Sequence, residues 1–482
     1  MTPIETLAGA GSWIKAASWR IASLALLIPG MLVSGCTSGS TATTTSSTQL
    51  NGPRNYVAPY VVGDTAPGNS VSAYQIDDTA QSFTKSTYAL GQVDGAAQLG
   101  ARTYYAGTTT SLKRGLLSLG TTYEFLFGGN ITTYSTPQTG SWAVELPNQS
   151  GGLVQLLGQP VEPIVPATNC PDFKTSQTYW FVTLPTTFGD LRTYVWDPTL
   201  ETVYGSVDIG GSGSTITFSN IQQYALPSAF DLDPTLGPPG PPATVVTSPQ
   251  TGACSQTHYG NTTVVPADLT VTNPGPDSTT PTVSLVGIGP TGLLVDSNAA
   301  EGESHLAPFY QDLLGAGTGA IGLPRPSSAL DTSALVGAQY LGFVYGAGSG
   351  RNDWSSLITS FGFASQPAGC QSVASQTSTM IYGGDFNGDN PATPGIQANG
   401  GFGNCDIAID LGTQDPDNNG LYPAATVYVG PFYAGNQTGA DYNFPAVAIA
   451  GQLGGKSAIF LLGIDFTGTP NQAWGLYLLQ SN

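Results

Sequence analysis

Short runs of aromatic and β-branched residues, each ended by glycine or proline, recur through this sequence of 482 residues. Residues 179–184 read Tyr-Trp-Phe-Val-Thr-Leu, and the runs 202–209 and 215–218 are joined by Gly210-Gly-Ser-Gly213. Two apolar runs joined by a glycine-rich turn are typical of a β-hairpin. A chain punctuated at such short intervals cannot form long helices, so the sequence predicts a mainly β protein.

The C-terminal part continues this pattern. Strands are expected at 446–450, 458–464 and 474–479, whereas helical patterns are few, at 328–337 and 354–360. The 63 glycines and 36 prolines fit frequent turns between antiparallel strands. No strict sequence repeat is visible.

The charge composition excludes several classes of protein. The chain has 12 Lys and Arg, 31 Asp and Glu, and a net charge of −19, so it lacks the basic surface that nucleic-acid binding needs. Its 2 histidines, His258 and His305, leave little room for chemistry based on several imidazoles. No catalytic set of residues is recognisable, and the catalytic residues stay unknown.

The N-terminus carries a targeting pattern. Lys15 and Arg20 precede an apolar run at 21–33, which has the length of a signal-peptide core and is shorter than the roughly 20 residues of a membrane-spanning helix. The run ends in Leu32-Val-Ser-Gly-Cys36, which resembles the lipobox of bacterial lipoproteins. The resemblance implies that residues 1–35 are a signal peptide and that Cys36 is lipidated.

Residues 36–53 are rich in Ser and Thr and predict a flexible tether behind the lipid. The lipoprotein resemblance also implies that a residue other than Asp after the cysteine, here Thr37, favours the outer membrane. The protein is therefore expected to be exported and anchored by lipid at the outer membrane or cell surface.

A proline-rich stretch, Leu236-Gly-Pro-Pro-Gly-Pro-Pro242, divides the rest of the chain. Proline cannot sit in a helix interior or a central strand, so 231–256 is predicted to be a linker or long loop. It separates a first β region at 54–230 from a second β region with acidic loops at 257–482.

Four cysteines follow the proposed lipidation site. An even number of cysteines in an exported protein favours disulfides over free thiols. Pairs within one half of the chain are preferred, which gives Cys170–Cys254 and Cys370–Cys405.

Two acidic segments are candidates for a calcium site. The first contains Asp385, Asn387 and Asp389, followed by Asp406, and resembles the calcium loop of integrin-type FG-GAP repeats. Alternate oxygen-bearing residues in a tight loop suit Ca²⁺, a hard cation that takes oxygen ligands.

Residues 193–209 resemble part of a β-propeller blade.

The second acidic segment contains Asp415, Asp417 and Asn419, followed by Gly420. The alternative for both segments is a set of ordinary Asx turns, in which the side chain bonds to nearby backbone.

These resemblances leave two architectures open. One is a β-propeller-like closed array, and the other is a set of packed β-sandwich or barrel units. Either arrangement protects strand edges from pairing with other chains.

The sequence favours a lipid-anchored cell-envelope protein with a non-enzymatic binding or scaffolding role. Its partners would be the membrane, through the N-terminal lipid, and a carbohydrate or protein ligand. Two alternatives are a calcium-dependent, carbohydrate-active envelope enzyme and a calcium-stabilised adhesion module. Apart from calcium, no cofactor is expected.

Overall fold

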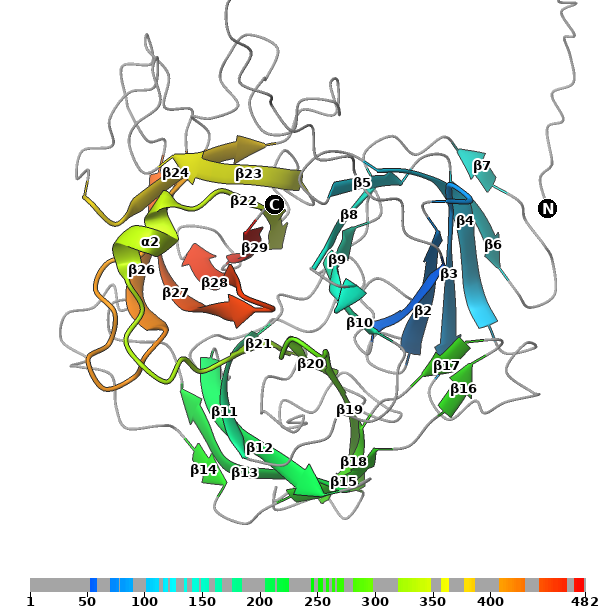
Figure 1. Ribbon diagram of the computed structural model, residues 1–482, viewed down its shortest axis with the longest axis horizontal. Helices are drawn as coiled ribbons and strands as arrows, with labels where there is room; N and C mark the ends of the chain where they lie inside the picture. The colour runs from blue at the N-terminus through cyan, green and yellow to red at the C-terminus, as the bar shows by residue number, and fades with distance from the viewer. Residues whose placement is uncertain are drawn as a thin grey trace, which may run out of the picture. The chain divides into compact units, whose positions relative to one another are not determined.

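The computed structural model is mainly antiparallel β, as the turn pattern predicts (Figure 1). It describes strands and adjoining segments between residues 53 and 480, and the longest stretches outside the described part are 1–52, 184–203, 225–243, 298–319 and 386–406. Among the described residues, no helix has the length and hydropathy needed to cross a membrane.

The first sheet folds into a closed ring of antiparallel strands. Because β3 pairs with both β2 and β4, and β1 pairs with β10, the order β1-β2-β3-β4-β5-β8-β9-β10 returns to its start (the first ring), with β6 and β7 added along β4. The strands are β1 (Arg54–Ala58), β2 (Ser70–Asp77), β3 (Ser82–Ala89), β4 (Ala101–Ser111), β5 (Leu116–Leu119), β6 (Thr122–Leu126), β7 (Tyr134–Thr136), β8 (Ser141–Glu145), β9 (Gly152–Gln155) and β10 (Val161–Pro166).

The second sheet closes in the same way. The order β11-β12-β13-β15-β18-β19-β20-β21 returns to β11 (the second ring), β14 is added to β13, and β16 and β17 form a separate hairpin. The strands are β11 (Gln177–Thr183), β12 (Tyr204–Ser212), β13 (Thr215–Tyr224), β14 (Thr244–Val246), β15 (Gln250–Cys254), β16 (Thr257–Tyr259), β17 (Thr262–Val264), β18 (Ala267–Thr272), β19 (Pro281–Ile288), β20 (Leu294–Ser297) and β21 (Ala320–Pro324).

The third sheet is a closed barrel in strict chain order, β22 to β29, in which β29 pairs with β22 (the third ring). The short helix α2 (Thr332–Gly337) precedes it. The strands are β22 (Tyr340–Ala347), β23 (Leu357–Phe363), β24 (Met380–Asp385), β25 (Ile407–Asp410), β26 (Leu421–Val429), β27 (Tyr442–Leu453), β28 (Lys456–Asp465) and β29 (Gln472–Gln480).

The three rings share one closing pair, defined here as the pairing of the first strand with the last. In each ring a buried tyrosine of the first strand lies opposite the final residue of the last strand. The pairs are Tyr56 with Pro166, Tyr179 with Pro324, and Tyr340 with Gln480. The chain therefore repeats one architecture three times.

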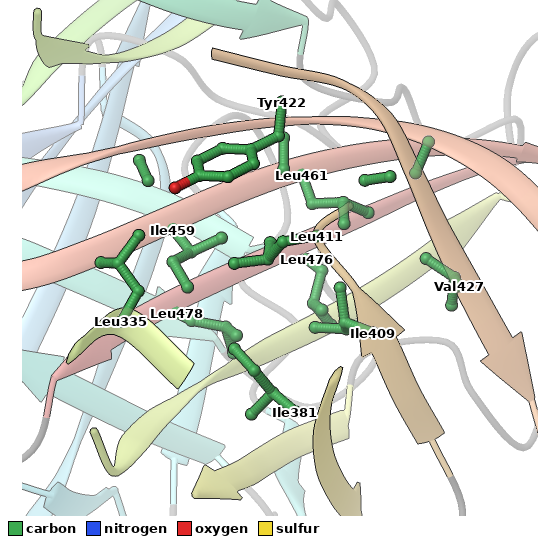
Figure 2. Packing of buried hydrophobic residues seen from close by; sticks show 14 of the residues in the cluster. Leu335, Ile381, Ile409, Leu411, Tyr422, Val427, Ile459, Leu461, Leu476 and Leu478 are labelled. Atoms are coloured by element: carbon green, nitrogen blue, oxygen red, sulfur yellow. The ribbon is translucent and has the colours of Figure 1, made fainter. Parts of the chain in front are cut away.

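Each ring has an apolar cluster to which its closing tyrosine belongs. In the third ring, Ile381, Ile409, Leu461 and Leu478 come from four strands and meet in the same cluster (Figure 2). Because side chains alternate between the two faces of a strand, every second residue of these runs faces the cluster.

Helix α2 supplies apolar side chains to the third ring. Asp331 caps the helix by accepting a hydrogen bond from the Ser333 amide, and Leu335 and Val336 join the cluster of the ring. The Tyr340 hydroxyl donates to the Leu335 carbonyl at 2.8 Å, which ties the helix to β22.

The strands predicted at 179–184, 446–450, 458–464 and 474–479 are confirmed as β11, β27, β28 and β29, and the predicted hairpin is formed by β12 and β13. The helix expected at 328–337 is present as the shorter α2.

The second predicted helix, 354–360, is wrong. The structure has β23 at Leu357–Phe363 instead, because both edges of this segment are taken up by pairing with β22 and β24. Tertiary pairing of this kind overrides a weak local helix preference.

The division into two β regions also differs from the structure. The segment 231–256, predicted as a linker or long loop, includes β14 and β15, which both pair with β13. The second ring therefore continues across this segment. Among the described residues, the sheets do not form a closed propeller, and the third sheet is a closed barrel.

The closing pair of the third ring can be tested at Gly342, which lies opposite Leu478. A Cβ at this position would meet the Tyr477 carbonyl oxygen at 1.8 Å, so Gly342→Ala must force β22 and β29 apart. We expect a loss of about 1–3 kcal/mol in the free energy of unfolding, measured by denaturant titration.

Gly337→Ala is the matched control, because a Cβ there meets no atom within 4 Å. Equal stability of the two variants would contradict the tight closing pair.

Candidate functional site

The first ring holds a pair of ionic centres in its interior. In one, Arg54 of β1 binds Glu145 of β8 through two bonds, Nε to Oε1 at 2.7 Å and Nη2 to Oε2 at 2.9 Å. The Tyr56 hydroxyl donates to the same carboxylate at 2.6 Å. The Arg54 side chain is 2% exposed and that of Glu145 is 11% exposed, so this fork is almost fully removed from water.

The second ionic centre lies deeper. Lys85 of β3 contacts Glu162 of β10, with Nζ 2.6 Å from Oε1, and the two side chains are 2% and 1% exposed. The Tyr74 hydroxyl donates to the other oxygen of Glu162. The Lys85 ammonium also lies 5.6 Å from the centre of the Tyr74 ring.

The two centres share a design, in which one carboxylate meets one cation and one tyrosine hydroxyl. Burial, followed by the charge of Glu145, raises the pKa of Tyr56, so this hydroxyl stays protonated and keeps donating its hydrogen bond. Tyr56 and Tyr74 lie opposite each other on β1 and β2, which brings the centres side by side. The arrangement holds two ion pairs inside the ring, each with a tyrosine hydroxyl donating to its carboxylate.

The position equivalent to Glu162 is apolar in the other two rings. Pro166, Pro324 and Gln480 lie opposite the closing tyrosines of the three rings. The residues at the same distance before them in the chain are Glu162, Ala320 and Leu476, respectively. Ala320 and Leu476 belong to the apolar clusters of the second and third rings. At this position, the described residues are thus charged in the first ring and apolar in the other two.

The second acidic segment lies where the second and third rings meet. The Trp180 indole donates to the Asn419 carbonyl at 2.8 Å, and Arg325 donates to the Asp417 carbonyl at 2.8 Å. The Arg325 guanidinium also lies 5.3 Å from the centre of the Trp180 ring.

Within this segment, Asp415 acts as an Asx turn. Its Oδ1 accepts hydrogen bonds from the Asp417 amide at 2.9 Å and from the Asn418 side chain at 3.2 Å. The Asn419 side chain donates to the Pro326 carbonyl. These bonds are those of an Asx turn held by protein donors, and a calcium-binding role for Asp415, Asp417 and Asn419 stays a prediction.

The first acidic segment is described only in part. The backbone of Asp385 ends β24, whereas Asn387, Asp389 and Asp406 lie outside the described residues. Within the described residues, no three His, Cys, Asp or Glu side chains come together in a way that could hold a metal ion.

The predicted lipidation site and disulfides also fall largely outside the described part. This applies to Cys36, Cys170, Cys370 and Cys405, while the backbone of Cys254 ends β15. The disulfide pairs stay predictions.

No protein-family model matches the chain, and a search of curated proteins finds no similar sequence.

Sequence reasoning missed the ionic centres of the first ring. A signal was present, because Arg54 and Lys85 are 2 of only 12 basic residues and each alternates with an aromatic residue in a strand-like run. A charge on the face of a strand that also carries Tyr56 or Phe83 indicates an ion pair inside the sheet.

The contact between the second and third rings predicts the effect of Trp180→Phe. The change keeps an apolar ring and removes the donor to the Asn419 carbonyl, which should cost about 1–2 kcal/mol. Hydrogen exchange should become faster in peptides covering 414–422.

Peptides from β1 and β10 serve as the internal control and should exchange at the unaltered rate. If exchange in 414–422 does not change, the indole bond does not hold this segment.

Proposed function

We propose that the protein is a lipid-anchored component of the cell envelope that binds or scaffolds other molecules and catalyses no reaction. The observation that carries the proposal is the Leu32-Val-Ser-Gly-Cys36 motif, followed by a Ser/Thr-rich tether that ends where β1 begins at Arg54. Several acyl chains on Cys36 would anchor the chain firmly, at about 0.8 kcal/mol for each buried CH₂.

The architecture supports a presenting role. Each ring pairs its first strand with its last, so its strand edges are satisfied within the ring. The bonds from Trp180 and Arg325 to the segment 417–419 connect the second ring to the third through backbone carbonyls. Surfaces on two rings are therefore held together by specific contacts, which suits a scaffold.

The charge of the chain restricts its partners. The net charge is −19, and removal of residues 1–35 would take away Lys15, Arg20 and Glu5, leaving the mature chain more acidic by one unit. Such a surface repels nucleic acid and anionic lipid headgroups. We therefore propose a carbohydrate or protein ligand at the outer membrane or cell surface, with the membrane contacted only through the lipid.

The anchor is tested by Cys36→Ala. In cells that express the protein, the wild type should incorporate radiolabelled palmitate and sediment with the envelope. The variant should lose the label and appear in the soluble fraction. Cys254→Ala is the control, because it alters a cysteine of β15 without touching the motif. A labelled or membrane-bound Cys36→Ala protein would reject the proposal.

A second candidate is a calcium-stabilised adhesion module, and one observation favours it. In the antiparallel pair β24–β25, Gly383 lies opposite Ile407. Asp385 follows Gly383 closely and Asp406 directly precedes Ile407, so the topology brings the two ends of the first acidic segment to the same end of this strand pair. That juxtaposition suits the convergence of ligands from Asp385, Asn387, Asp389 and Asp406 that a calcium site needs.

Thermal unfolding with Ca²⁺ and with a chelator tests this candidate. A cation bound only by the folded protein must raise the unfolding temperature. Asp385→Asn should remove the shift, whereas Asp415→Asn, in the turn between the rings, should retain it. An unfolding temperature that is equal with calcium and with chelator would reject the calcium site and leave the anchor proposal intact.

A further inference from the structure

We propose that consecutive rings dock through one repeated interface, in which the closing strand of a ring packs on the final hairpin of the ring that follows. The closing strand is the last strand of a ring, and the final hairpin is the strand pair before it, β19–β20 in the second ring and β27–β28 in the third. The inference rests on contacts between rings and needs no lipid anchor.

The same elements meet at both junctions. The closing strand β10 of the first ring contacts β20 of the second ring, and the closing strand β21 of the second ring contacts β27 and β28 of the third. Both β20 and β28 are the second strand of a final hairpin. The two junctions therefore use equivalent strands of different rings.

A glycine of each final hairpin lies against an apolar residue of the preceding ring. At Gly289, which directly follows β19, a Cβ would lie 3.7 Å from Cγ1 of Val165 in the first ring. At Gly451 of β27, a Cβ would lie 3.3 Å from Cβ of Leu323 in the second ring. Each glycine thus receives a side chain from the closing strand of its neighbour.

Little room remains for a side chain at either glycine. A Cβ at Gly289 would meet the Ser150 carbonyl oxygen of the first ring at 2.7 Å, and one at Gly451 would meet the Pro324 carbonyl oxygen of the second at 3.0 Å. Glycine in a strand often marks a site where another backbone approaches closely. Both junctions share this requirement.

The apolar residues at the two junctions occupy the same place in their strands. Val165 directly precedes Pro166 and Leu323 directly precedes Pro324, and the two prolines lie opposite the closing tyrosines. Because side chains alternate along a strand, Val165 and Leu323 project from the same face of equivalent strands. Their side chains are 2% and 0% exposed, so both are buried.

The surroundings of this shared contact differ. At the first junction, Leu293 of the second ring is fully buried, and its Cδ2 lies 3.5 Å from the position of a Cβ at Gly151 of the first ring. At the second junction, Gln414 Oε1 accepts hydrogen bonds from the Leu330 amide at 3.1 Å and from the Gly420 amide at 2.9 Å. Leu330 belongs to the linker between β21 and α2, so Gln414 adds a polar clasp there.

A repeated interface makes the three rings a tandem array, in which each ring recognises its neighbour through the same pair of surfaces. The partner that fits a closing strand is thus a ring of the same kind. Burial of the apolar side chain supplies the affinity, and the close fit at the glycine restricts which surface is accepted.

Hydrogen exchange of the full-length protein carrying Gly289→Ala or Gly451→Ala tests the proposal. Gly289→Ala should speed exchange about tenfold in peptides from β10, which lies in the preceding ring, and leave β21 unchanged. Gly451→Ala should speed exchange in β21 and leave β10 unchanged. We expect about threefold there, because the predicted clash is milder and the clasp of Gln414 persists.

The matched control is Gly210→Ala in β12, where a Cβ would meet Ser176 at an ordinary 3.4 Å. It should change exchange in neither β10 nor β21. Faster exchange confined to the ring that carries the substitution would overturn the proposal, and so would an equal change in all three rings.

Truncation on the other side of each junction decides the matter if an alanine variant does not fold. Val165→Ala should speed exchange in peptides covering 289–297 of the second ring, and Leu323→Ala should speed exchange in those covering 446–453 of the third. Unchanged exchange in these peptides would contradict the repeated interface.

Discussion

The pairing of first and last strands is the constraint on which the rest of this structure depends. An open sheet leaves a row of amide and carbonyl groups at each edge, and such edges bind other chains. The pairing of β1 with β10, β11 with β21 and β22 with β29 satisfies those groups within each ring. Once a ring is closed, its faces differ, and the inward one must be filled by side chains.

What fills the rings distinguishes them. The described interiors of the second and third rings centre on apolar clusters. The first ring uses two carboxylates with a lysine and an arginine, which attract strongly in a medium of low dielectric constant but carry a large cost of desolvation. Replacement of such pairs by apolar groups is often neutral for stability, whereas removal of one partner leaves a buried charge uncompensated and is strongly destabilising.

The strands could be predicted from the sequence where glycine turns flank apolar runs, as at β12–β13 and β27–β28. The ring closures could not, because they join residues far apart in the sequence and no local pattern encodes which strands meet. The segment 354–360 shows the same limit, since pairing with β22 and β24 decided its conformation. At the acidic loop, sequence identified Asp415 and Asn419 but not their partners Trp180 and Arg325, which are distant in the chain.

The described strands follow the chain from one ring to the next, and none of those in one ring is inserted into another. A chain that emerges N-terminus first, during synthesis or passage through a membrane, can therefore complete the first ring before any strand of the second appears. Each closure ends the exposure of edge strands left by the preceding segment. The order of the strands thus limits, at every stage, how much unpaired backbone the growing chain offers to its neighbours.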